Sequence, residues 1–564
     1  MARLLRRRSL TGIAVAALIC GGVAACSSSG STGGNGHSSS ASATLTMESS
    51  PETTITEAFN PYDTTQSAYG MGATGLIYEP LVQFDLANPT VQYPWLATSY
   101  TWADGGKQIT FTIRPGVKWN NGTPMTAADV AFTFGLIKKY AAINIGGLSI
   151  SSIATSGNTV TLTFPTPQYT NVEEIAGTAI LPKAIWSKVG NPATYTDANP
   201  VGTGPYMLSS FTPQGFTLKK NPDYWQPSKV KVSSVYFPVY TGNTAAATAL
   251  FTGQITWTGN YIQGLQKDFV DKAPAYHHYW EAAGGDESFE PNLTKWPTNQ
   301  LAVRQAISLA VSRNLLGSEG EAGLENPVLN ATGLTLPEFS AWSAPVASMT
   351  VSGAANPAGA EKVLENAGFT KGSNGFFQKG GKTVSITIIS PAAYTDMAEV
   401  DSIAAQELRN AGIDATFQGL AVTAWEQDVA DGDFSMTEHW ANGGITPYNM
   451  YNGWLNSALA TSTATGDYER VNDPALDSEL GTLSGANTVA QQTADLVPLE
   501  KYVAANLPVI PVETASEWFE YNSQNFVGWP SASDPYETGQ PSGTNNGPGT
   551  GTDEVVLLHL SPRT

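Results

Sequence analysis

Aromatic and amide side chains gather in one stretch of the chain, residues 438–455. The flat face of a tryptophan or tyrosine stacks on apolar ring surfaces, and a carboxamide both donates and accepts hydrogen bonds. The stretch therefore predicts a surface suited to the pyranose rings and hydroxyl groups of a sugar. Its candidate ligand-binding residues are Trp440, Asn442, Tyr448, Tyr451 and Trp454. Burial in a hydrophobic core is the alternative interpretation for each ring.

The side-chain patterns of common hydrolases and metal sites are missing from the sequence. It has five histidines, none of them in an HExxH motif, and no serine lies in a GxSxG motif. His277 and His278 are adjacent in a segment with strand character, where neighbouring side chains point to opposite faces. We therefore expect no catalytic residue, no metal site and no cofactor. A secreted glycoside hydrolase with two catalytic carboxylates remains an alternative, because acidic residues occur throughout the chain.

Two glycine-rich segments invite comparison with phosphate-binding loops. Residues 200–206 read PVGTGPY, but no lysine followed by serine or threonine stands at P-loop spacing. Residues 380–383 read GGKT, but the first glycine of that motif falls on Phe376. We reject both, and we expect the first segment to form a tight turn ahead of a strand near residues 216–219.

The first 25 residues have the pattern of a lipoprotein signal peptide. Arginines precede a short apolar run, and small residues precede Cys26, as in a bacterial lipobox. This pattern predicts cleavage before Cys26 and lipid attachment to its sulfur. Residues 26–42 are rich in glycine and serine, which predicts a flexible tether. Cys20 also lies in the leader, so no disulfide is expected in the folded body.

Length and charge narrow the function classes further. A chain of 564 residues is too long for one hydrophobic core, so we expect two large lobes or several smaller units. The formal net charge of −20 argues against nucleic acid as a partner, because phosphate backbones repel an acidic surface.

Residues 108–140 show most clearly how local elements should form. Ile109, Phe111 and Ile113 alternate with polar residues, which predicts a half-buried strand. Thr126 precedes Asp129 by three positions, which predicts a capping box at the start of a helix. Residues 96–113 predict a hairpin, and residues 358–434 alternate between helical and strand patterns, which is typical of an α/β lobe. Residues 554–560 (EVVLLHL) predict a final strand.

Residues 108–140 resemble the signature region of family 5 of the bacterial extracytoplasmic solute-binding proteins, the oligopeptide- and dipeptide-binding type. Further resemblances lie at residues 77–81, 200–206, 221–225 and 507–511, so the likeness covers residues 43–530. The matching residues of the signature are Arg114, Gly116, Val117, Lys118, Trp119, Asn121, Gly122, Thr123, Pro124, Thr126, Ala127, Asp129, Val130 and Phe132.

This resemblance implies an α/β architecture: a two-lobed fold of the periplasmic-binding-protein type II kind, with an extra subdomain in the first lobe and a hinge between the lobes. Lobe I would span residues 43–275, lobe II residues 276–508, and the chain would return to lobe I over residues 509–564. The resemblance also implies a monomeric, non-catalytic receptor that closes around a solute and delivers it to an ABC permease and its ATPase. We expect it at the outer face of the cytoplasmic membrane, held by the lipid anchor.

The ligand is the open choice within the family. Dipeptide-type receptors present an aspartate in the segment that corresponds to residues 440–447, and this chain has no carboxylate there. Residues 528–536 resemble a motif of cello-oligosaccharide receptors. Trp529 from that motif, and Trp280 from the expected crossing between lobes, join the candidate ligand-binding residues. A cello-type oligosaccharide is therefore the expected ligand, an oligopeptide or dipeptide is the alternative, and nickel is not expected.

Overall fold

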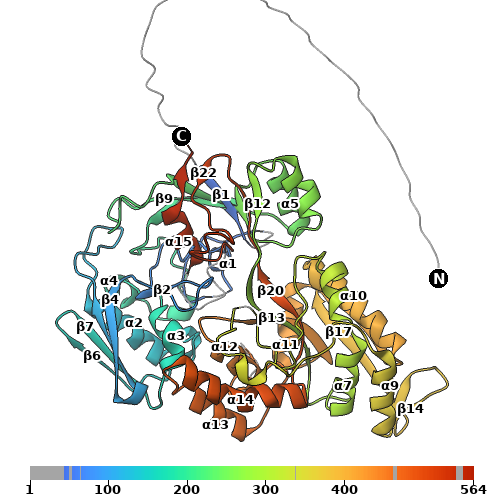
Figure 1. Ribbon diagram of the computed structural model, residues 1–564. Coiled ribbons are helices and arrows are strands. Elements are labelled where there is room, and N and C mark those ends of the chain that lie inside the picture. The colour runs from blue at the N-terminus through green and yellow to red at the C-terminus, as the bar shows by residue number, and fades with distance from the viewer. Residues whose placement is uncertain are drawn as a thin grey trace, which may run out of the picture. The chain divides into compact units, whose positions relative to one another are not determined.

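The two largest β-sheets, one in each lobe, organise the computed structural model of this chain (Figure 1). The structure describes residues 44–49, 54–63, 65–336, 338–460, 466–541 and 551–563, without the side chain of Asn442. The expected signal peptide, Cys26 and the whole tether lie outside these residues. Residues 42–564 form a single compact unit, which is described here by itself.

The sheet of the first lobe has seven strands in the order β12-β21-β11-β1-β10-β9-β8. Its central strand β1 pairs in parallel with β10 on one side and with β11 on the other. The strands are β1 (Thr44–Glu48), β8 (Tyr206–Thr212), β9 (Gly215–Lys220), β10 (Ser234–Pro238), β11 (Trp257–Thr258), β12 (His277–Tyr279) and β21 (Glu520–Asn522). The strand expected near residues 216–219 is therefore confirmed by β9.

A second sheet of the first lobe contains the signature stretch. It has the order β4-β5-β7-β6, with β4 (Ala97–Ala103), β5 (Gln108–Ile113), β6 (Ser152–Ser156) and β7 (Thr159–Thr163). Ile109, Phe111 and Ile113 are buried, which confirms the expected alternation and the hairpin. Because every second side chain of β5 enters the core, the strand provides an apolar face for the rest of the lobe.

Helix α2 (Ala127–Lys139) begins at the predicted capping box. One carboxylate oxygen of Asp129 accepts from the backbone N–H and from the hydroxyl of Thr126, both at 2.9 Å. The other oxygen accepts from the backbone N–H of Lys183 at 3.0 Å, in helix α4 (Lys183–Trp186). Asp129 therefore caps one helix and attaches it to a second.

Replacing Asp129 by alanine should lower the free energy of unfolding by about 1–2 kcal/mol, because a cap and a buried acceptor are lost together. Urea denaturation followed by circular dichroism measures this. Glu365→Ala is the matched control, since Glu365 is an exposed helix carboxylate and should change stability by less than about 0.5 kcal/mol. Equal stabilities of the two variants would contradict the capping role.

The second lobe is built on a five-stranded sheet of order β18-β17-β19-β13-β20. Its strands are β13 (Ala282–Pro291), β17 (Ser385–Pro391), β18 (Asp414–Leu420), β19 (Met436–Asn442) and β20 (Ile510–Glu517). Helices α7 (Leu301–Ala310), α9 (Pro357–Asn366) and α10 (Thr395–Asn410) share one apolar core with it. Helices α12 (Tyr448–Leu455), α13 (Pro474–Leu483) and α14 (Val489–Asn506) build a second core, and α11 (Val422–Asp431) a third. The expected α/β alternation is confirmed.

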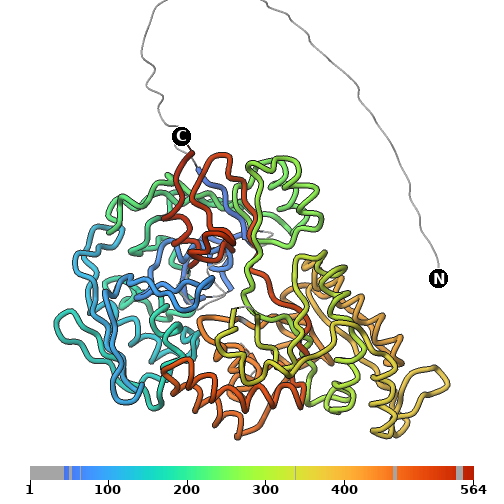
Figure 2. Tube along the Cα trace, in the orientation of Figure 1, coloured from blue at the N-terminus to red at the C-terminus, as the bar shows by residue number. Residues whose placement is uncertain are grey.

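The chain passes between the two large sheets twice, through two neighbouring strands (Figure 2). Strand β12 pairs with β21 in the first lobe. Strand β13, which follows β12, pairs with β20, which precedes β21, in the sheet of the second lobe. The short connections at residues 280–281 and 518–519 are thus the links between lobes. The lobe boundaries expected from the sequence lie near these links and remain predictions.

One expected strand is wrong. Residues 554–560 lie mostly in helix α15 (Thr552–His559), and nearly all of its side chains are buried. A helix buried on every side has no polar face, so its sequence shows no helical period and its β-branched residues imitate a strand. Elsewhere in lobe II, α7 ends at Ala310 and a separate helical turn, α8 (Arg313–Leu315), follows.

The remaining elements are short. They are α1 (Ser67–Gly70), β2 (Val82–Phe84), β3 (Gln92–Pro94), α3 (Val172–Ala176), α5 (Asn243–Phe251), α6 (Leu265–Asp268), β14 (Thr370–Lys371), β15 (Phe377–Lys379), β16 (Lys382–Thr383), β22 (Phe526–Val527) and β23 (Ser561–Pro562). Within the described ranges, no helix has the length and apolar character needed to cross a membrane.

Candidate ligand-binding site

The aromatic stretch expected to touch ligand forms strand β19 and helix α12. Tyr451 and Trp454 are 0% and 2% exposed and lie in the core shared with α13 and α14. The hydroxyl of Tyr451 donates to the carbonyl of Thr332 at 2.9 Å. Protein side chains cover the faces of both rings, so neither ring offers a stacking surface to a solute in this structure.

Trp440 and Tyr448 are placed differently. Trp440 is half-buried on β19 and stacks on His439 with a centroid separation of 4.5 Å. Tyr448 lines a narrow crevice where the two lobes meet. For Asn442 the structure describes the backbone, which pairs with Gly285 of β13, and its predicted contact with ligand stays a prediction.

Trp280 and Trp529 belong to the first lobe rather than to this stretch. Trp529 is 8% exposed, stacks on Tyr521 at 4.7 Å and donates its indole N–H to the carbonyl of Phe526. Trp280 is half-buried beside the link between the lobes, and its backbone N–H donates to the carbonyl of Phe519. The tryptophans predicted to bind ligand are therefore split between the two lobes, with Trp454 and Trp529 in cores and Trp280 and Trp440 half-buried.

His277 and His278 have separate partners on β12. Nδ1 of His277 donates to the carbonyl of Phe269 at 2.9 Å, and Nε2 of His278 shares a hydrogen bond with the hydroxyl of Ser523 at 3.1 Å. Their rings point to opposite sides of the strand, as the sequence predicts.

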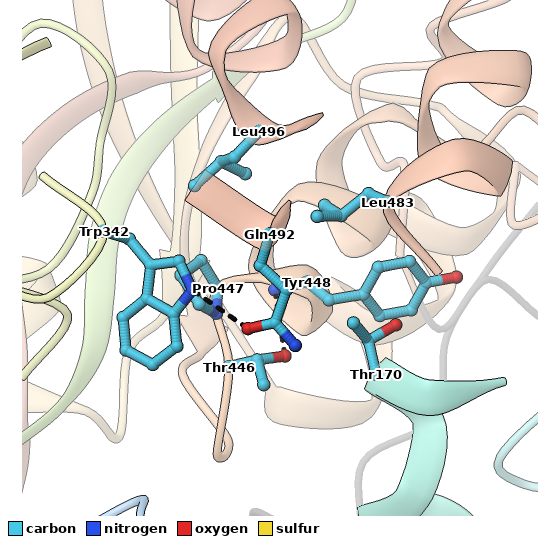
Figure 3. Close-up of a pocket in the computed structure, with 8 residues that line it drawn as sticks. All are labelled: Thr170, Trp342, Thr446, Pro447, Tyr448, Leu483, Gln492 and Leu496. Atoms are coloured by element: carbon cyan, nitrogen blue, oxygen red, sulfur yellow. Dashed lines mark hydrogen bonds between the residues drawn. The ribbon is translucent and has the colours of Figure 1, made fainter. Parts of the chain in front are cut away.

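A crevice between helices marks the contact of the lobes in Figure 3. Thr170 of the first lobe faces Tyr448, while Trp342 donates its indole N–H to the side-chain oxygen of Gln492 at 3.0 Å. Nearby, the backbone N–H of Tyr169 donates to the carbonyl of Ser484 at 3.0 Å. The space left between the lining side chains does not admit a water molecule. This crevice is a contact between the two lobes. A larger group of polar side chains lies beside it.

That feature is a group of carboxylates around a glycine turn. Glu173 of helix α3 is 1% exposed, and its Oε2 accepts from the backbone N–H of Ile445 at 2.9 Å. Its other oxygen is buried without a hydrogen-bond partner. Glu338 approaches the same turn from the second lobe, and its Oε2 is also buried without a partner. Glu517 closes the group from the end of β20.

Glycines make this convergence possible. The N–H of Gly443 donates to the carbonyl of Gly284 at 2.9 Å. A Cβ added to Gly443 would lie 2.7 Å from Oε1 of Glu338, and one added to Gly444 would lie 2.8 Å from Oε2 of Glu173. A Cβ on Gly284 would overlap Oε1 of Glu517. We name Glu173, Glu338 and Glu517 around Gly443 the cleft carboxylates.

The surroundings of the cleft carboxylates disfavour their ionised forms. Burial raises the pKa of Glu173 to about 8, and the neighbouring Glu174 adds to this effect. Burial raises the pKa of Glu338 well above its ordinary value, and the charges of Glu517 and Glu173 contribute. A cation placed among them would reverse both effects, because it stabilises the ionised carboxylates.

Sequence reasoning missed all three cleft carboxylates. They come from helix α3, from the loop before Trp342 and from a strand that returns late in the chain, so no local pattern joins them. The available signal was the Gly443–Gly444 pair, whose missing side chains leave room beside the backbone.

A family model for the middle part of the bacterial extracellular solute-binding proteins, family 5, matches residues 92–462. The match covers more than half of the chain. The chain belongs to family 5 of these solute-binding proteins. The resemblance and the two-lobed α/β fold expected from it are thereby confirmed, whereas membership of the cello-oligosaccharide branch is not.

Relatives in family 5 are named for different solutes. The nickel-binding periplasmic protein of Escherichia coli is 27% identical over 444 residues, which is 75% of this chain and 81% of that protein. The periplasmic oligopeptide-binding protein OppA of the same species is 24% identical, over 77% of this chain and 81% of that protein. All of them are solute-binding proteins rather than enzymes.

Solved structures of family 5 share the fold. A periplasmic oligopeptide-binding protein of Thermotoga maritima with bound mannohexaose has a TM-score of 0.82 at 23% identity, covering 92% of this chain and 98% of that one. DppA of Helicobacter pylori, bound to the peptide STSA, has a TM-score of 0.74 at 19% identity, covering 93% and 98%.

Proposed function

We propose that this chain is the solute receptor of an ABC importer and that its ligand is a short peptide or a similar solute with a free ammonium group. The cleft carboxylates converge where the two lobes and strand β20 meet. This convergence carries the proposal. Charge-assisted hydrogen bonds from an ammonium to carboxylates are among the strongest polar contacts, and they strengthen where water is excluded.

The position of the group suits a receptor that closes on its ligand. Glu173 belongs to the first lobe, Glu338 to the second, and Glu517 lies at the link between them. A cation bound by all three would hold the lobes together, which is the differential interaction that a ligand-driven closure requires. The missing aspartate of residues 440–447 is thus replaced by acids from other segments.

The sequence-based preference for a cello-type oligosaccharide has little support. Tyr451, Trp454 and Trp529 lie in hydrophobic cores, so the expected stacking platform is not assembled. Relatives named for oligopeptides, murein peptide and glutathione favour the peptide alternative. The Thermotoga maritima protein has bound mannohexaose in its crystal structure, so an oligosaccharide is the competing ligand in the test.

The remaining parts of the proposal follow from the sequence. Lipid attachment at Cys26 and the tether of residues 26–42 would hold a monomeric receptor at the outer face of the cytoplasmic membrane. An ABC permease and its ATPase would then receive the solute. Labelling with a radioactive fatty acid, with Cys26→Ala as the control, tests the anchor.

Calorimetric titration with a mixture of tripeptides, with their N-acetylated forms, and with cellobiose and mannohexaose tests the ligand. We expect free peptides to bind and N-acetylation to remove the binding. Glu338→Gln should weaken peptide binding about 10- to 100-fold, because a charge-assisted hydrogen bond contributes about 1.5–3 kcal/mol. Glu365→Gln, which changes an exposed carboxylate, should bind as the unaltered protein does. Binding of the sugars alone, or equal binding of acetylated peptides, would contradict the proposal.

A further inference from the structure

A second group of carboxylates lies in lobe II, on the sheet face that α10 covers. Glu287 of β13 stands directly opposite Glu513 of β20 in the strand register. Glu321 and Glu325 approach from the segment that follows the helical turn at Leu316–Gly320. One carboxylate oxygen from each of these four residues lies within 4.8 Å of the others.

This arrangement is unfavourable without a counter-charge. Like charges directly opposite each other on paired strands repel, and a buried carboxylate without a partner loses its hydration. Both oxygens of Glu321 and of Glu513, and one of Glu325, have no hydrogen-bond partner. The other oxygen of Glu325 accepts from the backbone N–H of Ser516 at 2.7 Å, which orients the side chain.

Another buried side chain points to the same place. Glu438 of β19 is 0% exposed, and neither of its oxygens has a hydrogen-bond partner. It is not one of the four converging residues, yet its pKa is raised by burial and then by Asp401, Glu287, Glu513 and Glu321. Glu438 is thus a buried carboxylate without a hydrogen-bond partner that is close enough to interact with three of the four converging residues, where a cation would supply the missing counter-charge.

We infer that Glu287, Glu321, Glu325 and Glu513 form a binding site for a divalent cation, with Ca²⁺ as the occupant. An all-oxygen ligand set is typical of hard cations. Ca²⁺–oxygen distances of about 2.3–2.6 Å place opposite ligands about 4.6–5.2 Å apart, which fits the observed spread.

The site has an entrance and a structural consequence. Glu287 and Asp396 are half-buried, whereas Glu321, Glu325 and Glu513 are buried, so an ion would enter on the Glu287 side, where water can complete its coordination. A bound cation would join β13 and β20, which carry the chain between the lobes, to the segment of residues 321–325. This inference does not depend on the identity of the transported solute.

The test uses the mature protein, treated with a chelator and dialysed, at pH 7.5. Ca²⁺ alone should raise the midpoint of thermal unfolding by about 3 °C or more, because a ligand that binds only the folded state stabilises it. Glu321→Gln/Glu513→Gln should lose this rise, and so should Glu287→Gln, which changes a half-buried position and is therefore the variant more certain to fold. Glu500→Gln is the matched control, because Glu500 is a buried carboxylate of α14 without hydrogen-bond partners and outside the group.

Calorimetry with Ca²⁺ should show one binding event in the unaltered protein and in Glu500→Gln. Calorimetry should show no binding event in the variants of the four carboxylates. Circular dichroism checks that these variants fold. Absence of any effect of Ca²⁺ on the unaltered protein would overturn the inference. Full retention of the Ca²⁺ effect in Glu287→Gln and in the double variant would overturn it as well.

Discussion

The free energy of unfolding should be higher at pH 5 than at pH 8. Lobe I buries a pair of carboxyl groups, Glu79 and Glu554, each 0% exposed. Burial raises the pKa of Glu79 from its ordinary 4.5 to about 7, and burial raises the pKa of Glu554 well above its ordinary value, with the charge of Glu79 adding to the effect. A group whose pKa is higher in the folded state contributes full stability below its unfolded pKa and loses it as the pH rises through its folded pKa.

The surroundings of the pair support this direction. Oε1 of Glu79 accepts from the indole N–H of Trp225 at 2.8 Å. Glu554 accepts from the side-chain amide of Gln83 at 2.8 Å and from the hydroxyl of Tyr224 at 3.2 Å. Arg114, which stacks over Trp225 at 4.3 Å, is the cationic group that acts on Glu79. These contacts offset the effect of burial only in part. The contribution of Glu79 to the free energy of unfolding should therefore fall by about 3 kcal/mol between pH 4.5 and pH 7.

Urea denaturation in the presence of a chelator at pH 5 and pH 8 measures this effect. Glu554→Gln should be more stable than the unaltered protein at pH 8 and similar to it at pH 5, because the amide removes one buried charge. Its oxygen can still accept from Gln83, and its N–H can donate to the hydroxyl oxygen of Tyr224. Glu365→Gln should follow the pH profile of the unaltered protein. A stability at pH 8 that equals or exceeds the stability at pH 5 would contradict the prediction.

Gly202→Ala should reduce the free energy of unfolding by about 3 kcal/mol or more. A Cβ on Gly202 would overlap the carbonyl oxygen of Ile77 and lie 2.5 Å from its carbonyl carbon. The obstacle is backbone, which cannot rotate away as a side chain can. The neighbouring Gly204 donates its N–H to that carbonyl of Ile77 at 2.9 Å, so the two segments are tied at close range.

Thermal and urea unfolding of Gly202→Ala measure this loss. Gly190→Ala is the matched control, because no atom lies within 4 Å of a Cβ at that exposed position and its backbone φ is not in the left-handed region. It should change stability by less than about 0.5 kcal/mol. Similar losses in both variants would show that the close approach to Ile77 does not limit this position.

The same glycine shows how far sequence reasoning reaches. Because residues 200–206 lack a P-loop lysine, we expected a turn there and no phosphate-binding loop. That the glycines serve a close approach to residues 76–77 depends on a segment more than a hundred residues away. No spacing within PVGTGPY contains that information.

Features that depend on near neighbours were predicted well. The alternation of Ile109, Phe111 and Ile113, the capping box of Thr126 and Asp129, and the α/β alternation of lobe II all appear in the structure. Hydrogen bonds and side-chain periods within four residues decide such features, so they are encoded locally. The family is encoded in the same way, as an ordered set of turns and helix starts.

Features that depend on burial and distant contacts required the tertiary structure. Tyr451, Trp454 and Trp529 are core residues, and residues 552–559 form a helix, because surrounding segments cover them on all sides. Glu173 meets Ile445 across 272 positions of sequence, and Glu287 stands opposite Glu513. By itself, the sequence determined the local elements and the family of this protein. The fold decided which carboxylates share a site, since only the packing of lobes and the strand register bring charges from distant segments together.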